Sequence, residues 1–322
     1  MSALSTLRSR LGRKADDTQD EVDLRRELLA LHEKLDHLTD MVDRLAWYRK
    51  QDAKWKAIFR KQLASVIRAQ YLDSELAAPH ALEARRFRLR SQNEEDGIVL
   101  ALLKATGVRD RRFVEIGSGG TGGNSGVLAY ELAWSGLMID ASGAAVRAAR
   151  TQFASRPQVL VERKFLTTDN IDKVLTKCGF AGEVDFLSID VDSVDYWLLD
   201  ALSATTARVL AIEYNALFGP DRAVTLPNAP KPKGVPKGYF GASLAALDRC
   251  AQRKGYRLVL CEDAGINAFF VRKDLALEIP TLTPAQAWRP KSDRFDVTGE
   301  IPALELDIYK VIGKNGLPLV EV

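Results

Sequence analysis

The chain has 322 residues, of which 46% are apolar, and its 46 basic and 43 acidic side chains give a net charge of +3. This length and apolar content allow one domain with a core of normal size, with or without extensions. The small charge excess is not that of a nucleic-acid-binding protein, so we predict no nucleic-acid partner. Three widely spaced cysteines without a C-x-x-C pair favour free thiols in a reducing cytoplasm over a disulfide framework or a zinc site.

The N-terminal end does not have the pattern of a secretory signal. It lacks the long apolar stretch of a secretory signal, and the chain contains no run of eighteen apolar residues. We therefore predict a cytoplasmic protein without a transmembrane segment. Residues 1–20 are expected to form a flexible tail.

An apolar seam follows this tail. Its members alternate in steps of four and three residues, namely Leu24, Leu28, Leu31, Leu35, Leu38, Val42 and Leu45. The spacing is that of a coiled coil of about three heptads, and charged residues fill the positions between. We predict a helical coiled-coil region at 21–80 that drives self-association through residues 24–45. The alternative is an amphipathic helix packed on its own domain.

From about residue 81 short apolar runs alternate with helical stretches. The expected strands are 113–116, 137–139, 159–162, 186–189 and 209–212. Strands alternating with helices predict an α/β fold, a Rossmann-like, doubly wound and mostly parallel sheet. Two neighbouring strands at 257–261 and 268–271 predict a C-terminal antiparallel hairpin. The predicted domain spans 81–273, and an extension of unassigned role follows at 274–322.

A glycine-rich turn follows the first predicted strand, in the sequence EIGSGGTGG. Its G-x-G-x-x-G pattern alone fits either a dinucleotide or S-adenosylmethionine. Glu115 stands just before the glycines, where a carboxylate suits an ammonium group and disfavours a pyrophosphate. Asp140 ends the second strand, where an acid can accept hydrogen bonds from ribose hydroxyls of either cofactor. The combination favours S-adenosylmethionine, and an NAD-dependent enzyme on the same fold remains the alternative.

Further stretches resemble those of class I S-adenosylmethionine-dependent methyltransferases, and more closely of the FkbM-like family. They are S-Q-N-E-E-D-G before the first strand, T-T-D-N-I after the third, and D-F-L-S-I-D-V-D-S-V-D at the fourth. In the last stretch aspartates replace two glutamates of the family pattern. Ser193 replaces its glycine, so we expect a different turn there. The resemblance covers about residues 85–273 and says little about the acceptor.

This resemblance implies a set of cofactor-binding residues. The methionine end would lie against Glu115 and the glycine turn, the ribose against Asp140, and the adenine against Asp169. The full expected set is Glu115, Gly117, Ser118, Gly119, Asn124, Asp140, Ala141, Ser142, Asp169 and Asn170. Two alternatives stay open: Asp140 as a plain turn residue, and Asp169 with Asn170 as a cap of the helix that begins near residue 171.

Acidic and amide side chains follow the fourth and fifth strands. The candidate catalytic residues there are Asp190, Asp192, Glu213 and Asn215. Ligands bind beyond the carboxyl ends of parallel strands, so both groups are expected to face one crevice. Methyl transfer to an alcohol requires removal of a proton, and all three histidines precede the sheet. Asp190 is therefore the candidate base.

The same oxygen-rich residues suit a divalent cation. Carboxylate and amide oxygens are ligands for Mg²⁺ and similar ions. A metal site at Asp190, Glu213 and Asn215 would be similar to that of catechol-type O-methyltransferases, and a solvated turn is the alternative.

A loop rich in Pro, Gly and Lys spans 219–238. Its three lysines could close over an anionic substrate, or the loop could be a solvated lid. The neighbouring aromatic residues Tyr214, Tyr239 and Phe240 could stack on a sugar ring or pack in the core.

The resemblance implies an O-methyltransferase that acts on a hydroxyl of a sugar, a glycan or a secondary metabolite. A non-catalytic coiled-coil scaffold is a further alternative.

Overall fold

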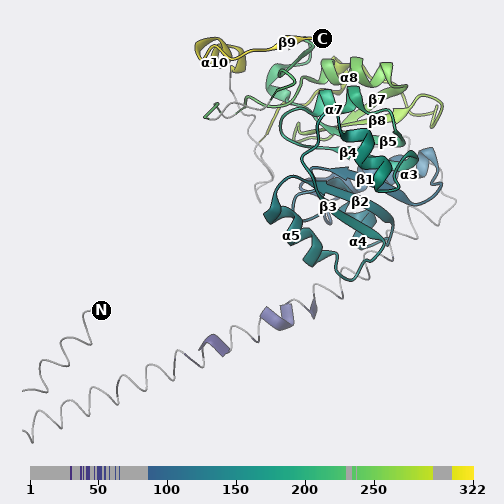
Figure 1. Cartoon of the computed structure of the whole chain (residues 1–322). Helices are drawn as coiled ribbons and strands as arrows, with labels where there is room; N and C mark the ends of the chain where they lie inside the picture. The colour runs from purple at the N-terminus through teal and green to yellow at the C-terminus, as the bar shows by residue number, and fades with distance from the viewer. Residues whose placement is uncertain are drawn as a thin grey trace, which may run out of the picture. The chain divides into compact units, whose positions relative to one another are not determined.

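The structure is a computed structural model of the chain (Figure 1). It describes residues 86–229, 234–236, 238–292 and 307–322, together with scattered residues between 30 and 65. The chain divides into two units, Met1–Leu63 and Ala64–Val322, which are considered separately. The predicted tail, nearly all of the apolar seam and the three lysines of the 219–238 loop lie outside the described residues.

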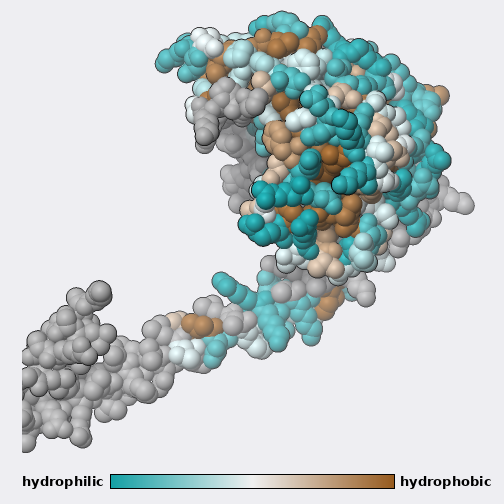
Figure 2. All heavy atoms as spheres, in the orientation of Figure 1, coloured by the Kyte–Doolittle hydropathy of each residue, from teal (hydrophilic) through white to brown (hydrophobic). Residues whose placement is uncertain are grey.

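The described residues of the first unit are all helical. Several carry large apolar side chains that are exposed in the single chain, and some are visible as brown spheres in Figure 2. They are Met41, Val42, Trp47, Trp55 and Ile58. Nowhere in the part of the chain that the structure describes is a helix both long and apolar enough to cross a membrane.

A seven-stranded sheet forms the centre of the second unit, with the strand order β3-β2-β1-β4-β5-β8-β7. The strands are β1 (Arg112–Ile116), β2 (Ser135–Asp140), β3 (Val159–Arg163), β4 (Gly182–Ile189), β5 (Thr205–Glu213), β7 (Tyr256–Cys261) and β8 (Asn267–Arg272). The first five are mutually parallel, whereas β8 runs antiparallel to both β5 and β7. This topology confirms the predicted doubly wound, mostly parallel fold with a C-terminal antiparallel hairpin.

Helices pack on the sheet, which explains why its strands are apolar on both faces. The helical segments are α3 (Glu95–Thr106), η3 (Gly123–Ser125), α4 (Gly126–Tyr130), α5 (Gly143–Gln152), α6 (Ile171–Lys177), α7 (Asp195–Ala201) and α8 (Leu244–Arg253). Val114, Leu187 and Leu210 of the central strands share one core cluster with the apolar side chains of α6, α7 and α8. Because strand side chains alternate, the equally buried Phe113 and Phe186 point to the opposite face.

A small substructure joins two segments far apart in the sequence. It contains η4 (Ala216–Phe218), the two-residue strands β6 (Val224–Thr225) and β9 (Val320–Glu321), and α10 (Ile308–Lys314). Phe218, Tyr239 and Ile308 belong to its own apolar cluster. The short helix α9 (Pro284–Ala287) lies between the two segments in the sequence and contacts β7 and α8. The sequence did not predict this substructure, which gives part of the C-terminal extension a packing role.

Candidate active site

The strand order places a topological switch point between β1 and β4. β2 lies on one side of β1 and β4 on the other, so the connections leave in opposite directions at this point. Open α/β sheets bind ligands at such a switch point, outside the carboxyl ends of the strands. The predicted glycine turn follows β1, and the predicted acidic residues lie at the carboxyl ends of β4 and β5, so both lie at this edge of the sheet.

Gly117 is required by the protein's own backbone. Its φ is +86°, and a Cβ atom on it would lie 1.5 Å from the carbonyl oxygen of Asp190. The Asp190 amide donates to Ile116 O at 2.8 Å, which draws the ends of β1 and β4 together. Gly119 also has a positive φ, of +56°, but its Cβ position has no atom within 4 Å. The turn is therefore tight at its first glycine and open at its second.

Glu115 points beneath the turn. Its side chain is fully buried and accepts hydrogen bonds from the amides of Asn124 (3.1 Å) and Ser125 (2.9 Å) and from the Ser125 hydroxyl. Burial raises the pKa of this carboxyl to about 8. The observed contacts give Glu115 the role of fixing η3 at the end of the turn. Its predicted contact with a cofactor stays a prediction.

Asp140 connects the glycine turn to α5. Its Oδ2 accepts from the Gly119 amide at 2.9 Å and its Oδ1 from the Ser142 amide at 2.7 Å. Ser142 in turn caps α5 through the Ala145 amide, at 3.3 Å. These bonds are those of a turn residue. An ionised carboxylate has about four acceptor positions, so Asp140 can still accept from a ligand hydroxyl.

The remaining cofactor candidates lie around these turns. Ala141 is exposed, whereas Ser118 and Asn124 are buried. After β3, Asp169 is exposed. Asn170 begins α6 without a side-chain capping bond, and its amide instead braces the preceding loop at Thr167 N (3.0 Å) and Phe165 O (3.1 Å).

Asp190, Asp192 and Glu213 form an acidic centre at the ends of β4 and β5. One carboxylate oxygen from each lies within 4.8 Å of the others. Burial, followed by the charges of Asp195 and Asp192, raises the pKa of Asp190 to about 7. Burial and the neighbouring Asp190 charge raise the pKa of Glu213 well above its usual range. Such a pair retains a proton near neutral pH and can exchange it.

The turn that carries Asp190 is organised by Asp195. This fully buried carboxylate accepts from the amides of Val191 (2.7 Å) and Ser193 (3.0 Å). The left-handed residue of the turn is Asp192, with φ +58°. Aspartate tolerates this conformation better than most side chains. The tight turn therefore forms without a glycine, and its left-handed residue is Asp192 rather than Ser193.

Asn215, a member of the predicted metal set, uses its side chain to hold the backbone. Its amide group donates to Gly238 O at 2.7 Å and Phe240 O at 2.9 Å, and its oxygen accepts from the Leu217 amide at 3.1 Å. These bonds commit the buried side chain to the backbone around the 219–238 loop. Asp192 lies with Asp190 and Glu213, and the place of Asn215 in the metal set stays a prediction. A sequence shows which polar residues end a strand, but not which of them the backbone will use.

The aromatic residues near the loop are mostly core residues. Tyr214 and Tyr239 are buried, which agrees with core packing rather than stacking on a sugar. The Tyr214 hydroxyl donates to Arg289 O and accepts from the Arg289 amide. This bond holds the segment that bears Lys291, whose Nζ lies 4.5 Å from the ring centroid of Phe240. The Lys291 charge partly offsets the rise in the Glu213 pKa. No sequence pattern indicated Lys291.

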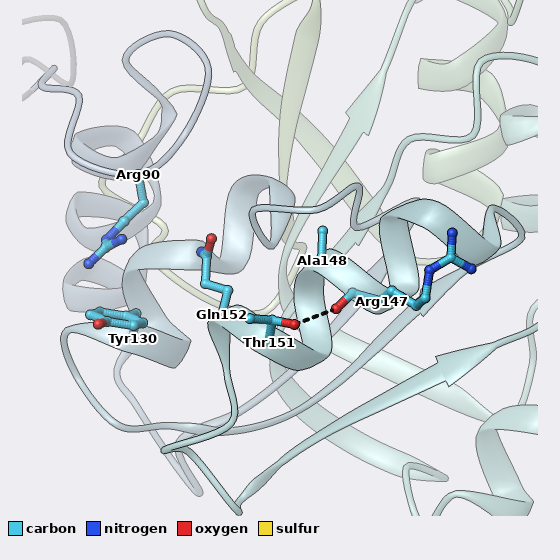
Figure 3. A pocket seen from close by; sticks show the side chains of 6 residues that line it. All are labelled: Arg90, Tyr130, Arg147, Ala148, Thr151 and Gln152. Carbon is cyan, nitrogen blue, oxygen red and sulfur yellow. Dashed lines mark hydrogen bonds between the residues drawn. The ribbon is translucent and has the colours of Figure 1, made fainter. Parts of the chain in front are cut away.

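A separate depression of about 620 Å³ lies on the outer side of α4 and α5 (Figure 3). It is lined by Arg90, Tyr130, Arg147, Ala148, Thr151 and Gln152. The Arg90 guanidinium is already occupied, since it pairs with Glu131 and lies over the Tyr130 ring. The depression contains none of the predicted site residues, so we assign it no ligand.

Comparison with known proteins is weak at the level of sequence. No protein-family model matches the chain, and no curated protein matches it. The chain is similar to the solved N-terminal domain of EvdMO1 with SAH bound (13% identity, 55% of this chain, 79% of that chain, TM-score 0.36). It is also similar to a SAM-dependent methyltransferase from Aquifex aeolicus (15%, 54%, 89%, TM-score 0.32). A third is the putative RNA methyltransferase PH1948 from Pyrococcus horikoshii (13%, 66%, 98%, TM-score 0.36). These TM-scores are too low to carry an argument, so the fold assignment rests on the strand order itself.

Proposed function

We propose that the protein is an S-adenosylmethionine-dependent O-methyltransferase. The observation that carries the proposal is the meeting of a glycine turn with an acidic centre at the switch point of the sheet. Gly117 lets β1 end against β4, and Asp190 follows β4 directly. A methyl donor bound at the turn would thus lie beside a carboxyl group that can accept a proton.

The residues around the turn fit this donor. The Cβ position of Gly119 is open, so a ligand can approach its backbone. Asp140 and the exposed Asp169 follow neighbouring strands and offer carboxylates to a ribose and an adenine. When bound, S-adenosylmethionine supplies an electrophilic methyl group. The pKa of Asp190, about 7, suits a group that takes the acceptor hydroxyl's proton near neutral pH.

The acceptor class rests on the sequence resemblance alone. It points to a hydroxyl of a sugar, a glycan or a secondary metabolite, and to the FkbM-like branch. We also propose that the chain self-associates through residues 24–45 and acts in the cytoplasm. The NAD-dependent alternative predicts a pyrophosphate at the turn, and the scaffold alternative predicts no ligand there.

Calorimetric titration of S-adenosylmethionine and, separately, of NAD tests the proposal. We expect micromolar binding of S-adenosylmethionine alone. Asp140→Ala should abolish that binding while circular dichroism shows an intact fold, since the substitution removes a partly exposed carboxylate. Binding of NAD instead would support the NAD-dependent alternative, and wild-type affinity in the variant would disprove the role of Asp140.

A divalent cation at the acidic centre is a second candidate feature. Glu213 is only 6% exposed, and its Oε2 has no hydrogen-bond partner among the described residues. Carboxylates so arranged fit Mg²⁺ or Mn²⁺, which would lower the pKa of an acceptor hydroxyl. Titration with Mn²⁺ should then show binding that Glu213→Gln removes. Equal heats for both proteins would reject the cation.

A further inference from the structure

Most of the S-Q-N-E-E-D-G stretch, which precedes the first strand of the sheet, is buried, and within it only Gln92 is exposed. Asp96 holds the backbone that leads into the stretch, because one of its carboxylate oxygens accepts from the amides of Leu89 (2.6 Å), Arg90 (2.5 Å) and Ser91 (3.0 Å). These contacts are local in the sequence and explain why Asp96 is buried. They do not explain Glu95, which is also fully buried at the start of α3.

Glu95 reaches across the fold to β8. Its oxygens accept from the amide and the side chain of Asn93, at 2.8 and 3.1 Å. The side-chain nitrogen of Asn267 also donates to Glu95 Oε1, at 3.1 Å. The two residues are 172 positions apart in the sequence. A buried carboxylate needs such donors, so Glu95 fixes the orientation of the Asn267 amide group.

Asn267 passes this orientation on to the glycine turn. Its Oδ1 accepts from Asn124 Nδ2 at 3.3 Å, and the same nitrogen donates to Ser188 Oγ at 3.1 Å. Asn124 lies in η3, where its backbone amide is also bound by Glu115. Asn267 is meanwhile the register partner of Glu213 across β5 and β8. The Asn267 side chain therefore contacts the end of the glycine turn, while its backbone lies in β8, next to the strand β5 that carries Glu213.

We propose that Asn267 is a positioning residue that fixes the glycine turn relative to the acidic centre, with Glu95 setting its orientation. The inference rests on the proposed function, because it concerns how the glycine turn, where the methyl donor would bind, is held relative to the acidic centre. An amide suits this place since it donates at one end and accepts at the other. In a buried network of this kind, all hydrogen-bonding groups have partners in only one arrangement of the side chains, so the network is rigid.

Reversal of the polarity of the Glu95–Asn267 bond tests the proposal. Asn267→Asp alone places two carboxyl groups face to face. Glu95→Gln alone leaves the new NH2 group facing a donor, either the Asn93 amide or Asn267 Nδ2, since both now donate to the carboxylate. The double variant restores a donor at 95 and an acceptor at 267. The carboxylate that it places at position 267 can still accept from Asn124, and the Asn93 amide can rotate to match. We expect each single variant to bind S-adenosylmethionine about ten-fold more weakly and the double variant to recover the loss.

Two further variants separate positioning from general stability. Asn267→Ala removes both bonds without a change of charge and should also weaken binding. Asp185→Asn is the matched control, because this buried carboxylate accepts from the amides of Arg109, Asp110 and Arg112 at the start of β1. It should lower the melting temperature without changing the affinity for S-adenosylmethionine.

Hydrogen exchange at the amides of residues 117–125 supplies a readout that needs no ligand. Faster exchange there in the single variants, reversed in the double variant, supports the proposal even if the wild-type chain binds no S-adenosylmethionine. That last result would reject only the proposed function. Wild-type exchange and affinity in Asn267→Ala, or a double variant as impaired as the singles, would overturn the positioning role.

Discussion

At the scale of the residue, Gly117 gives the sharpest test of the site's geometry. Gly117→Ala places a methyl group against the Asp190 carbonyl and forces a left-handed φ on alanine. We expect a loss of about 3 kcal/mol or more in the free energy of unfolding, measured by urea titration. Gly119→Ala is the matched control, since it has the same strain but open space, and should cost about 1 kcal/mol. Equal losses would show that β1 and β4 do not approach as described.

Glu115 predicts how stability depends on pH. Its pKa rises on folding from a usual 4.5 to about 8, so within this window the folded chain holds a proton that the unfolded chain releases. The free energy of unfolding then falls as pH rises, by at most about 1.4 kcal/mol for each pH unit from this group. Urea titrations between about pH 5 and pH 8 should show that the free energy of unfolding falls less steeply with pH in Glu115→Gln than in the wild type.

Glu183 is the control of opposite sign. Hydrogen bonding to Arg272 and Arg208 lowers the pKa of its carboxyl below 4.5, so its contribution is present above that pH and is lost as pH falls. Glu183→Gln should change the profile only in acid. If the free energy of unfolding of Glu115→Gln changes with pH in parallel with that of the wild type between about pH 5 and pH 8, Glu115 does not hold a buried proton.

At the scale of the element, the central strands could be predicted because each is buried on both faces and so reads as a continuous apolar run. The strands β6 and β9 could not, since each has two residues and depends on a partner about a hundred positions away. The site divides in the same way. Strand ends placed Asp190 and Glu213 together, but only the folded backbone directs Glu115 under the turn and Asn215 into the loop.

The helix α10 should hold the loop substructure in place. Ile308 is 1% exposed and packs with Phe218 and Tyr239. Ile308→Ala removes buried methyl groups and should destabilise this cluster by about 2–4 kcal/mol, seen as faster hydrogen exchange at β6. Leu277→Ala is the control, because Leu277 is 76% exposed. Unchanged exchange at β6 would show that α10 does not support the loop.

At the scale of the whole molecule, the first unit should determine the oligomeric state. In the single chain its described residues expose Met41, Val42, Trp47 and Trp55, and the apolar seam lies in the same unit. Exposed apolar side chains on a helix gain by packing against another copy. Light scattering after size exclusion should therefore show an oligomer for the full chain and a monomer for residues 64–322.

Substitutions within the seam separate this effect from that of truncation. Leu31→Lys with Leu38→Lys changes two seam positions and should yield the monomer, because a charge there would have to be buried. Leu29→Lys adds a charge outside the seam and should leave the oligomer intact. If the full chain already has the mass of a monomer, or if Leu29→Lys dissociates the oligomer as readily as the seam variant, the helix does not associate through residues 24–45.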